Sequence, residues 1–383
     1  MNRLLFSENR RFYLVGMLFS SLMGGCAFPV IPSSGPVDSS DFTRLKTPNY
    51  PKGIAPSGTF SVKVNLQTMP YERLSSLGDG GELLFNPGFG KSYFYVSKGK
   101  TKEIRASDFN SWPKLMPDGH VEISSEDYGS DSSRFNSSYP YSLDRSEPCF
   151  YNDGSVLIVD AANIPGDRRA TYTLYRKWFR PEPEHAKMGD KAVELRSEIV
   201  YRAPNPVIFL EKSDTDTVWV QDRHGSEHLG TDQLIRIKDG KQEKVPLPKG
   251  YENVQRIAQT KDTVVGTFGI QSGVKPYRNF RKVGHDWKEL PIPEGFVMSF
   301  VQKVFYDGTI LGFVTNSDAT KMVSVLWKGD NVAILDEQPN WPKHWGMSMA
   351  VLSNRNGLLY VQDGLGRDIV AKRCYLIKVS AKE

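Results

Sequence analysis

Two short runs that mix aromatic and basic side chains are the clearest candidates for ligand chemistry. They span residues 175 to 180 and 277 to 282, and they contribute the candidate binding residues Arg176, Trp178, Arg180, Tyr277, Arg278 and Arg281. Arginine beside an aromatic face can hold sugar rings, anionic head groups or an acidic protein through stacking and charge-assisted hydrogen bonds. In a strand, alternate residues face opposite sides, so we expect an inward aromatic set and an outward cationic set. Sheet packing with a solvated face is therefore the favoured interpretation.

The other polar residues form no catalytic constellation. His224 and His228 are spaced for one face of a helix, but Gly225 and the surrounding strand and turn pattern favour a solvated loop over a metal site. The chain lacks a Gly-x-Ser-x-Gly elbow and a glycine-rich phosphate loop. We expect no catalytic residue, no metal and no cofactor.

The chain has three cysteines, Cys26, Cys149 and Cys374. No CxxC pair and no Cys/His cluster supports redox chemistry or structural zinc. In an oxidising compartment Cys149 and Cys374 either form a disulfide, worth about 4 kcal/mol for so long a loop, or remain two buried thiols.

The amino-terminal segment has the layout of a cleaved export signal. Arg3, Arg10 and Arg11 form a positive region, and Phe12 to Leu22 form an apolar stretch. That stretch is well short of the roughly 20 residues that span a bilayer core. Without residues 1–25 the net charge falls from +5 to +3, because three arginines and one glutamate are lost. So near-neutral a balance gives no electrostatic case for a nucleic-acid partner.

Leu22-Met23-Gly24-Gly25-Cys26 resembles a bacterial lipoprotein signal, with Met23 in place of the usual leucine. The resemblance implies a signal peptide over residues 1–25 and a mature chain that begins at Cys26, which carries the lipid (palmitate). Ala27, rather than aspartate, implies the outer membrane, with the protein facing the periplasm. An ordinary secretory signal that happens to contain a cysteine is the alternative.

The rest of the chain divides into a tether and one domain. Residues 26–57 are rich in proline, serine and glycine, which predicts a flexible tether that cannot bury a core. From residue 58 to 383 short alternating or β-branched runs are separated by turn residues, which predicts a single all-β domain.

Internal repeats predict a β-propeller. Val245 to Tyr251 is echoed by Leu290 to Phe296, and turn dipeptides feed strands in units that start at 81, 119, 154, 216, 262, 308 and 357. The unit from Gly308 offers four runs: Thr309 to Thr315, Met322 to Trp327, Asn331 to Leu335 and Ser348 to Leu352. Repeats of 40 to 50 residues with four strands are typical of propeller blades.

We therefore predict about seven four-stranded blades, with six or eight as alternatives. The last unit is short, and Phe60 to Leu66 forms a strand outside any unit. We expect this amino-terminal strand to complete the last blade and close the ring, because an open ring would leave an exposed edge.

Ser324-Val325-Leu326-Trp327-Lys328-Gly329 is similar to the run of aliphatic residue, Leu-Trp and turn glycine in secreted bacterial propeller repeats. The glycine and tryptophan spacing of the outer-membrane assembly lipoprotein family is absent. The resemblance implies a propeller but no specific function.

The lipoprotein-like signal and the propeller architecture favour a non-enzymatic binding module, which is held by its lipid at the envelope membrane and recognises an envelope protein. An immunity protein against a toxin that acts in the periplasm is one version. The alternative is a polysaccharide-binding or polysaccharide-degrading propeller that uses its central channel for a glycan. Carboxylates and an arginine or histidine gathered at one channel mouth would favour that alternative.

Overall fold

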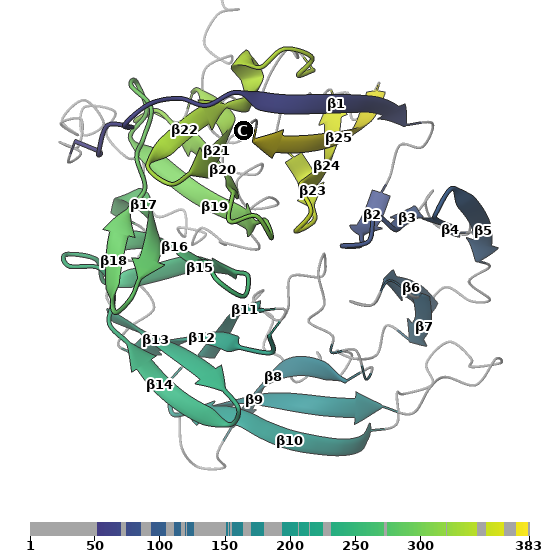
Figure 1. Cartoon of the computed structure of the whole chain (residues 1–383). Coiled ribbons are helices and arrows are strands. Elements are labelled where there is room, and N and C mark those ends of the chain that lie inside the picture. Colours follow the sequence, from purple (N-terminus) through teal and green to yellow (C-terminus); the bar gives the residue numbers. More distant parts are fainter. Residues whose placement is uncertain are drawn as a thin grey trace, which may run out of the picture.

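The computed structural model is all-β and consists of sheets arranged in a ring, as the repeats predict (Figure 1). Apart from one 3-10 turn, Leu335–Glu337, the described residues contain no helix, and hence none that could span a membrane. The structure describes residues 52–69, 74–85, 93–104, 111–115, 119, 121–125, 151, 153, 155–163, 170–179, 194–205, 207–213, 215–224, 231–271, 274–318, 320–342, 350–363 and 373–381.

Five antiparallel sheets have four strands each, and the first strand named lies nearest the centre of the ring. They are β2 (Leu74–Leu77), β3 (Leu83–Phe85), β4 (Tyr93–Ser97) and β5 (Lys100–Ile104); β11 (Val207–Lys212), β12 (Val218–His224), β13 (Thr231–Lys238) and β14 (Lys241–Val245); β15 (Asn253–Gln259), β16 (Val264–Gln271), β17 (Val274–Val283) and β18 (Asp286–Glu289); β19 (Met298–Val304), β20 (Ile310–Thr315), β21 (Met322–Lys328) and β22 (Asn331–Ile334); and β23 (Ala350–Ser353), β24 (Leu358–Asp363), β25 (Arg373–Ala381) and β1 (Val62–Met69).

A sixth sheet completes a set of six blades with three or four strands. It contains β8 (Val156–Asn163), β9 (Ala170–Phe179) and β10 (Glu194–Ala203), with β10 at the periphery. Six blades lie within the predicted range. The two-stranded sheet of β6 (Ser111–Leu115) and β7 (Val121–Ser125) lies in the ring between this blade and the first one.

The ring closes through its amino-terminal strand, as predicted. β1 pairs antiparallel with β25 along eight residues, from Val62 opposite Ala381 to Met69 opposite Cys374. Val62, Val64 and Ile377 belong to one buried cluster that also includes residues of the neighbouring blade. The first and last strands of the domain are therefore held together by a full ladder and a shared apolar core.

The repeat units of the sequence differ from the blades by one strand. The run predicted as the fourth strand of the Gly308 unit is β23, which pairs with β24 in the next sheet, while β19 precedes the turn and pairs with β20. Likewise Val207–Lys212 belongs with β12 and not with the preceding unit. The Asp307-Gly308 and Asn356-Gly357 turns lie between the first and second strands of a blade, so they mark its second strand.

These turns share one backbone geometry. A backbone N–H donates to the carbonyl four residues later, at 2.8 to 3.0 Å. The donor and acceptor pairs are Gly78 and Glu82, Tyr151 and Ser155, Ser213 and Thr217, Phe305 and Thr309, and Asn354 and Leu358. Gly308 and Gly357 adopt φ of 78° and 74°, a region that glycine enters without strain. Because Tyr151–Ser155 precedes β8, β8 corresponds to the second strand of the other blades.

Each innermost strand of the four-stranded blades carries a register shift against its second strand. Such bulges turn side chains and bend the strand. In β15 the backbone N–H of Val254, beside the shift, donates to the buried Asp232 of the preceding blade at 2.7 Å. In β19 Val301 donates in the same way to Thr267 at 3.0 Å. Side chains of one blade thus fix the inner strand of the next.

The amino-terminal approach to the ring runs along its outside. The Ile54 carbonyl accepts from Ile292 N at 2.8 Å, Ser57 N donates to the Asp330 carbonyl at 3.0 Å, and Gly58 bridges Asn331. The last residues of the segment predicted as tether, 52 to 57, therefore lie against the outer edges of two blades. The predicted signal peptide, Cys26 and the earlier tether lie outside the described residues.

Candidate functional site

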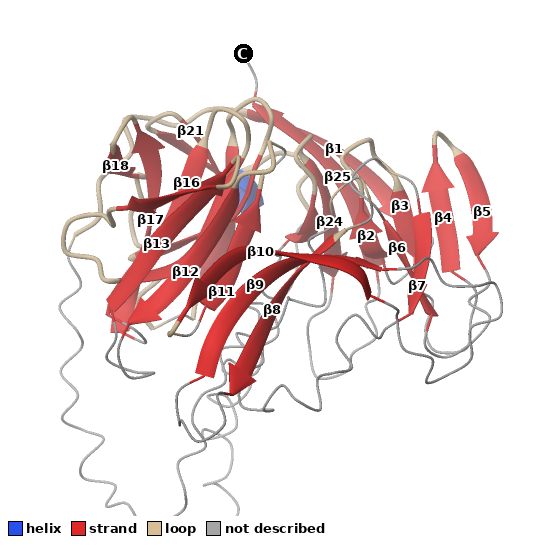
Figure 2. Cartoon of the chain, turned by 90° about the horizontal axis from the view of Figure 1, so that it is seen from below, coloured by secondary structure: helices blue, strands red, loops and turns tan. Residues whose placement is uncertain are grey.

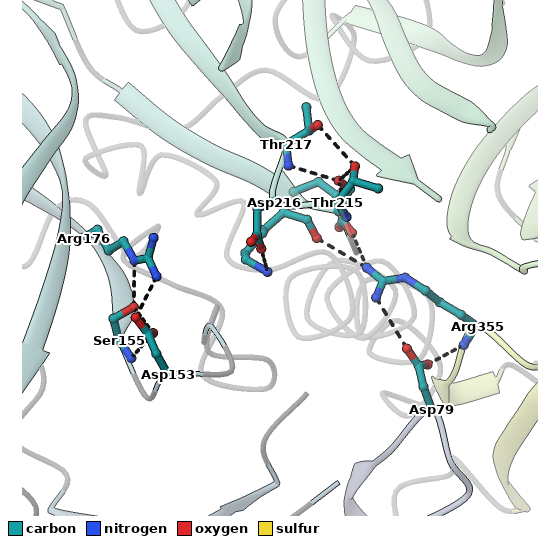
Figure 3. Close-up of polar contacts among 11 residues, drawn as sticks. Asp79, Asp153, Ser155, Arg176, Thr215, Asp216, Thr217 and Arg355 are labelled. Carbon is teal, nitrogen blue, oxygen red and sulfur yellow. Dashed lines mark hydrogen bonds and ion pairs between the residues drawn. The ribbon is translucent and has the colours of Figure 1, made fainter. Parts of the chain in front are cut away.

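A polar cluster joins turns from neighbouring and more distant blades near the centre of the ring (Figure 3). Arg355, in the turn between β23 and β24, uses its backbone N–H and its guanidinium on Asp79, in the turn between β2 and β3. The distances are 2.8 Å from Arg355 N to Asp79 Oδ1 and 3.4 Å from Nη1 to Oδ2. Nη2 reaches Glu211 Oε1 at 3.4 Å and the Lys212 carbonyl at 3.3 Å, at the end of β11. One arginine thus ties together three blades.

Tyr306 adds a fourth blade to this cluster. Its hydroxyl donates to Asp79 Oδ2 at 3.1 Å, and its backbone N–H donates to the Arg355 carbonyl at 2.8 Å. Burial raises the pKa of Tyr306, and the negative charge of Asp79 raises it further. The phenol therefore stays protonated and donates a hydrogen bond at neutral pH. We call Asp79, Glu211, Tyr306 and Arg355 the mouth cluster.

Two carboxylates and an arginine gather where turns of several blades meet near the centre of the ring, which is the kind of cluster that the glycan alternative requires. Their side chains are partly shielded, at 29% exposed for Asp79, 18% for Glu211 and 17% for Arg355. Within the described residues no three His, Cys, Asp or Glu side chains are placed to hold a metal.

The first predicted run forms a second polar cluster, on β9 and beside the turn before β8 (Figure 3). Figure 2 shows β8, β9 and β10 side by side in this blade. Arg176 donates from Nε to Ser155 Oγ at 2.7 Å and from Nη2 to Asp153 Oδ2 at 2.9 Å. Its guanidinium lies 3.6 Å from the Tyr151 ring centre and 4.9 Å from that of Trp178. Trp178 Nε1 also donates to Asp153 Oδ2, at 3.0 Å.

This geometry corrects the expected division of the run into an inward aromatic set and an outward cationic set. Arg176 and Trp178 are two residues apart, so they share one face of β9, and they stack there. On the other face Lys177 lies 5.1 Å from the Tyr175 ring centre. Burial would raise the pKa of Asp153, but hydrogen bonds from Ser155 and Trp178 and the charge of Arg176 lower it below the ordinary value. The carboxylate therefore holds the cluster together.

The second predicted run lies on β17, two blades away around the ring, so the structure does not bring the runs together. Arg278 is buried, with 1% of its side chain exposed, and pairs with Glu289 at 3.1 Å. A Cβ at Gly53 would lie 2.4 Å from Arg278 Nη1 and 3.3 Å from Ile292 Cβ, so the amino-terminal segment packs closely over this guanidinium. Arg278 is therefore enclosed between Glu289 and that segment.

The remaining predicted residues have separate surroundings. Tyr277 packs against Phe300 with ring centres 5.4 Å apart, and Arg281 Nη2 lies 3.9 Å from Asp330 Oδ1. Cys374 is buried and accepts a hydrogen bond from Tyr360 at 3.2 Å. Arg180, Cys26 and Cys149 lie outside the described residues, so the disulfide between Cys149 and Cys374 stays a prediction.

Sequence reasoning missed the mouth cluster. Gly81 and Gly357 mark turns in the sequence, but the charges that meet near the centre of the ring belong to Asp79 and Arg355, two residues before each glycine. Asp79 and Arg355 are 276 residues apart, and Glu211 and Arg355 are 144 apart. A charged residue next to each repeat turn was the available signal.

Comparisons with known proteins give no family. No protein-family model matches the sequence, and no curated protein matches it. Among solved structures, a puromycin-hydrolysing peptidase from Mycobacterium tuberculosis has a TM-score of 0.39 at 10% identity, over 77% of this chain and 48% of the peptidase. This chain therefore spans about half the length of the peptidase. A putative oxidoreductase (glucose dehydrogenase) from Thermus thermophilus has a TM-score of 0.33 at 12% identity, over 83% of this chain and 100% of that one. TolB from Acinetobacter baumannii has a TM-score of 0.24 at 12% identity, over 97% and 90% of the two chains.

Proposed function

We propose that this chain is a lipid-anchored scaffold of the bacterial envelope that binds another protein. The observation that carries the proposal is where the amino-terminal segment meets the ring. Residues 54 to 58 bond to Ile292, which follows β18, and to the start of β22, and they lead into β1, the peripheral strand of the closing blade. An anchor at Cys26 would therefore hold the ring by its side, and the channel mouths would not be occupied by the attachment.

The tether length fits such a role. Residues 27–51 would connect the lipid to the ring, and a flexible coil of this length reaches about 30 Å. The resemblance of Leu22–Cys26 to a lipoprotein signal supports the anchor, and Ala27 supports the outer membrane. A rigid ring at that distance from a membrane could present an interface on the order of 1,600 Å².

Labelling and cross-linking in intact bacteria test both parts of the proposal. The wild-type chain should incorporate palmitate, sediment with membranes and cross-link to a specific envelope protein. Cys26→Ala should lose all three properties while keeping its thermal stability. Cys374→Ala is the matched control: it removes a cysteine buried within the ring and should keep the label.

Two results would contradict the proposal in different ways. Equal labelling of wild type and Cys26→Ala would refute the anchor. Absence of any specific cross-linked protein from labelled, membrane-bound wild type would refute the binding role. An immunity protein is one version of the scaffold, and it predicts protection of the cell from a periplasmic toxin that disappears in Cys26→Ala.

The mouth cluster favours a second candidate, a module that binds envelope polysaccharide at the channel mouth. Carboxylates and a guanidinium are common partners for sugar hydroxyls. Polysaccharide fragments should then bind the wild-type chain and bind Arg355→Lys much more weakly, because lysine cannot reproduce the forked contact. Equal binding by both chains would exclude the mouth cluster as a glycan site.

A further inference from the structure

Strand β10 differs from the outer strands of the other blades. In four of the other blades the outer strand has only four or five residues, whereas β10 has ten. These four outer strands are β5, β14, β18 and β22. Lysines occur in β5, β14 and β18, and Gly58 bridges Asn331 at the edge of β22. Short length, lysine and covering segments are the usual protections of an edge against pairing with another chain. β10 is long and ends its sheet, and its charged residues, Glu194, Arg196, Glu198 and Arg202, carry both signs, so the edge excludes strands that do not match this pattern (Figure 1).

The outer segment of β10 also exposes apolar side chains. Leu195 is 56% exposed and Ile199 is 55% exposed, which is unusual for large aliphatic residues in a strand. Register shifts next to β9 lie on both sides of Arg196–Ile199, so this segment is regular. Gln242 Nε2 contacts the Val200 carbonyl at 3.4 Å, beyond the regular segment. In the described part of the chain no strand pairs with the outer edge from Leu195 to Ile199.

The sequence of this segment is complementary to itself in an antiparallel register centred on Ser197. Arg196 would face Glu198 of the second copy, and Glu198 would face Arg196 of the second copy. Leu195 lies at the register shift of β10, so the regular pairing would cover Arg196, Ser197 and Glu198. Opposite charges and apolar pairs across strands stabilise a sheet, and like charges destabilise it. A parallel register with the same centre would instead place arginine opposite arginine.

We propose that two copies of this chain associate by antiparallel pairing of β10 around a two-fold axis at Ser197. Arg196 is already positioned for this contact, because its guanidinium lies 4.7 Å from the Trp178 ring centre. Arg196 also pairs with Glu198 of its own strand, and both side chains are largely exposed, at 64% and 45%. The two copies would share a four-charge network and a sheet of six strands. This inference is independent of the proposed function.

Charge exchange at positions 196 and 198 tests the pairing in the full chain. Wild type should show a monomer–dimer equilibrium by sedimentation at tens of micromolar. Arg196→Glu and Glu198→Arg should each weaken the dimer by about tenfold or more, because every cross-strand charge pair becomes repulsive. A mixture of the two variants should recover the dimer as a heterodimer, since each glutamate of one chain then faces an arginine of the other.

The mixing experiment separates a specific interface from damage to the fold. Both single variants should keep the wild-type melting temperature, because the two side chains are exposed. Arg236→Glu is a matched control, since Arg236 forms a similarly exposed pair with Glu243 on another blade, and it should dimerise as wild type does. A monomeric wild type, single variants that dimerise like wild type, or a mixture that stays monomeric would each overturn the proposal.

Discussion

The same kind of turn precedes β20 in the blade of β19–β22 and β8 in the blade of β8–β10, but the two blades bury very different shares of their strands. All six residues of β20 are buried, and its neighbour β21 is buried from Ser324 to Trp327. In β10 the first six residues are exposed. The first blade is apolar on both faces because it is packed between two neighbouring blades, whereas the outer strand of the second carries charges to solvent. The same repeat architecture thus forms a buried, well-packed blade in one place and a blade with an exposed outer strand in another.

The largest expected contrast between the two blades is at their tryptophans. Trp327 is fully buried and its Nε1 donates to the Pro291 carbonyl at 2.7 Å, while Trp178 is partly exposed on β9. Trp327→Ala should lower the free energy of unfolding by about 4 kcal/mol through a cavity and a lost hydrogen bond. Trp178→Ala should cost about 1 kcal/mol. Urea denaturation of both variants measures the difference, and equal losses would show that the blades are packed alike.

A smaller contrast is expected between Asp232, in the well-packed blade of β11–β14, and Asp153, in the turn before β8. Asp232 has no exposed side-chain surface and accepts from Gln221 Nε2 at 2.6 Å, Val254 N at 2.7 Å and Arg223 Nε at 3.4 Å. Asp232→Ala would leave these buried donors without their acceptor and should cost about 2 to 3 kcal/mol. Asp153→Ala, at an exposed ion pair of the other blade, should cost under about 1 kcal/mol. The ranking would be wrong if Asp153→Ala were the more damaging substitution in thermal unfolding.

The same two aspartates should differ in the pH dependence of stability. The pKa of Asp153 is lowered in the folded chain, so its contribution is present above the ordinary carboxyl pKa and is lost as pH falls through the folded value. Burial raises the pKa of Asp232 in the folded chain, although its hydrogen bonds oppose the shift. Ionisation of Asp232 therefore lowers stability as pH rises from the ordinary carboxyl pKa through the folded value. On acidification from neutral pH, the difference between wild type and Asp153→Ala should shrink. A difference that grows on acidification would contradict the sign.

The smallest effect is expected at the mouth cluster, which links blades without burying much surface. A double-mutant cycle with Asp79→Asn and Arg355→Lys should give a coupling energy of about 1 kcal/mol, because the pair is partly shielded from water. A cycle with Arg236 and Glu243, an exposed pair within one blade, should give about 0.3 kcal/mol. Equal coupling in the two cycles would mean that the contact between blades is no stronger than an ion pair within one blade.

Much of the fold could be predicted from the sequence because the repeat turns have strict backbone requirements. Gly308 and Gly357 mark turns that a residue with a Cβ would strain. The blade boundaries could not be placed, because the inner strands, such as Met298–Val304, carry no turn signal of their own and resemble the end of the preceding unit. The mouth cluster could not be predicted either, because Arg355 meets Asp79 and Glu211 only after the ring has closed.

The pairing of β1 with β25 closes the ring, and it also determines that the amino-terminal segment joins the ring at its outer side. Lys63 and Ser380 are opposite each other and exposed, so Lys63→Cys with Ser380→Cys should form a disulfide, which requires Cα atoms within about 7 Å. Gln67→Cys with Ser380→Cys is the control, because four residues along a strand separate the sites by about 14 Å. For the first pair we predict a disulfide-linked peptide joining positions 63 and 380 in mass mapping, and a higher melting temperature than in the reduced protein. Equal cross-linking of both pairs, or none at position 63, would contradict closure by β1.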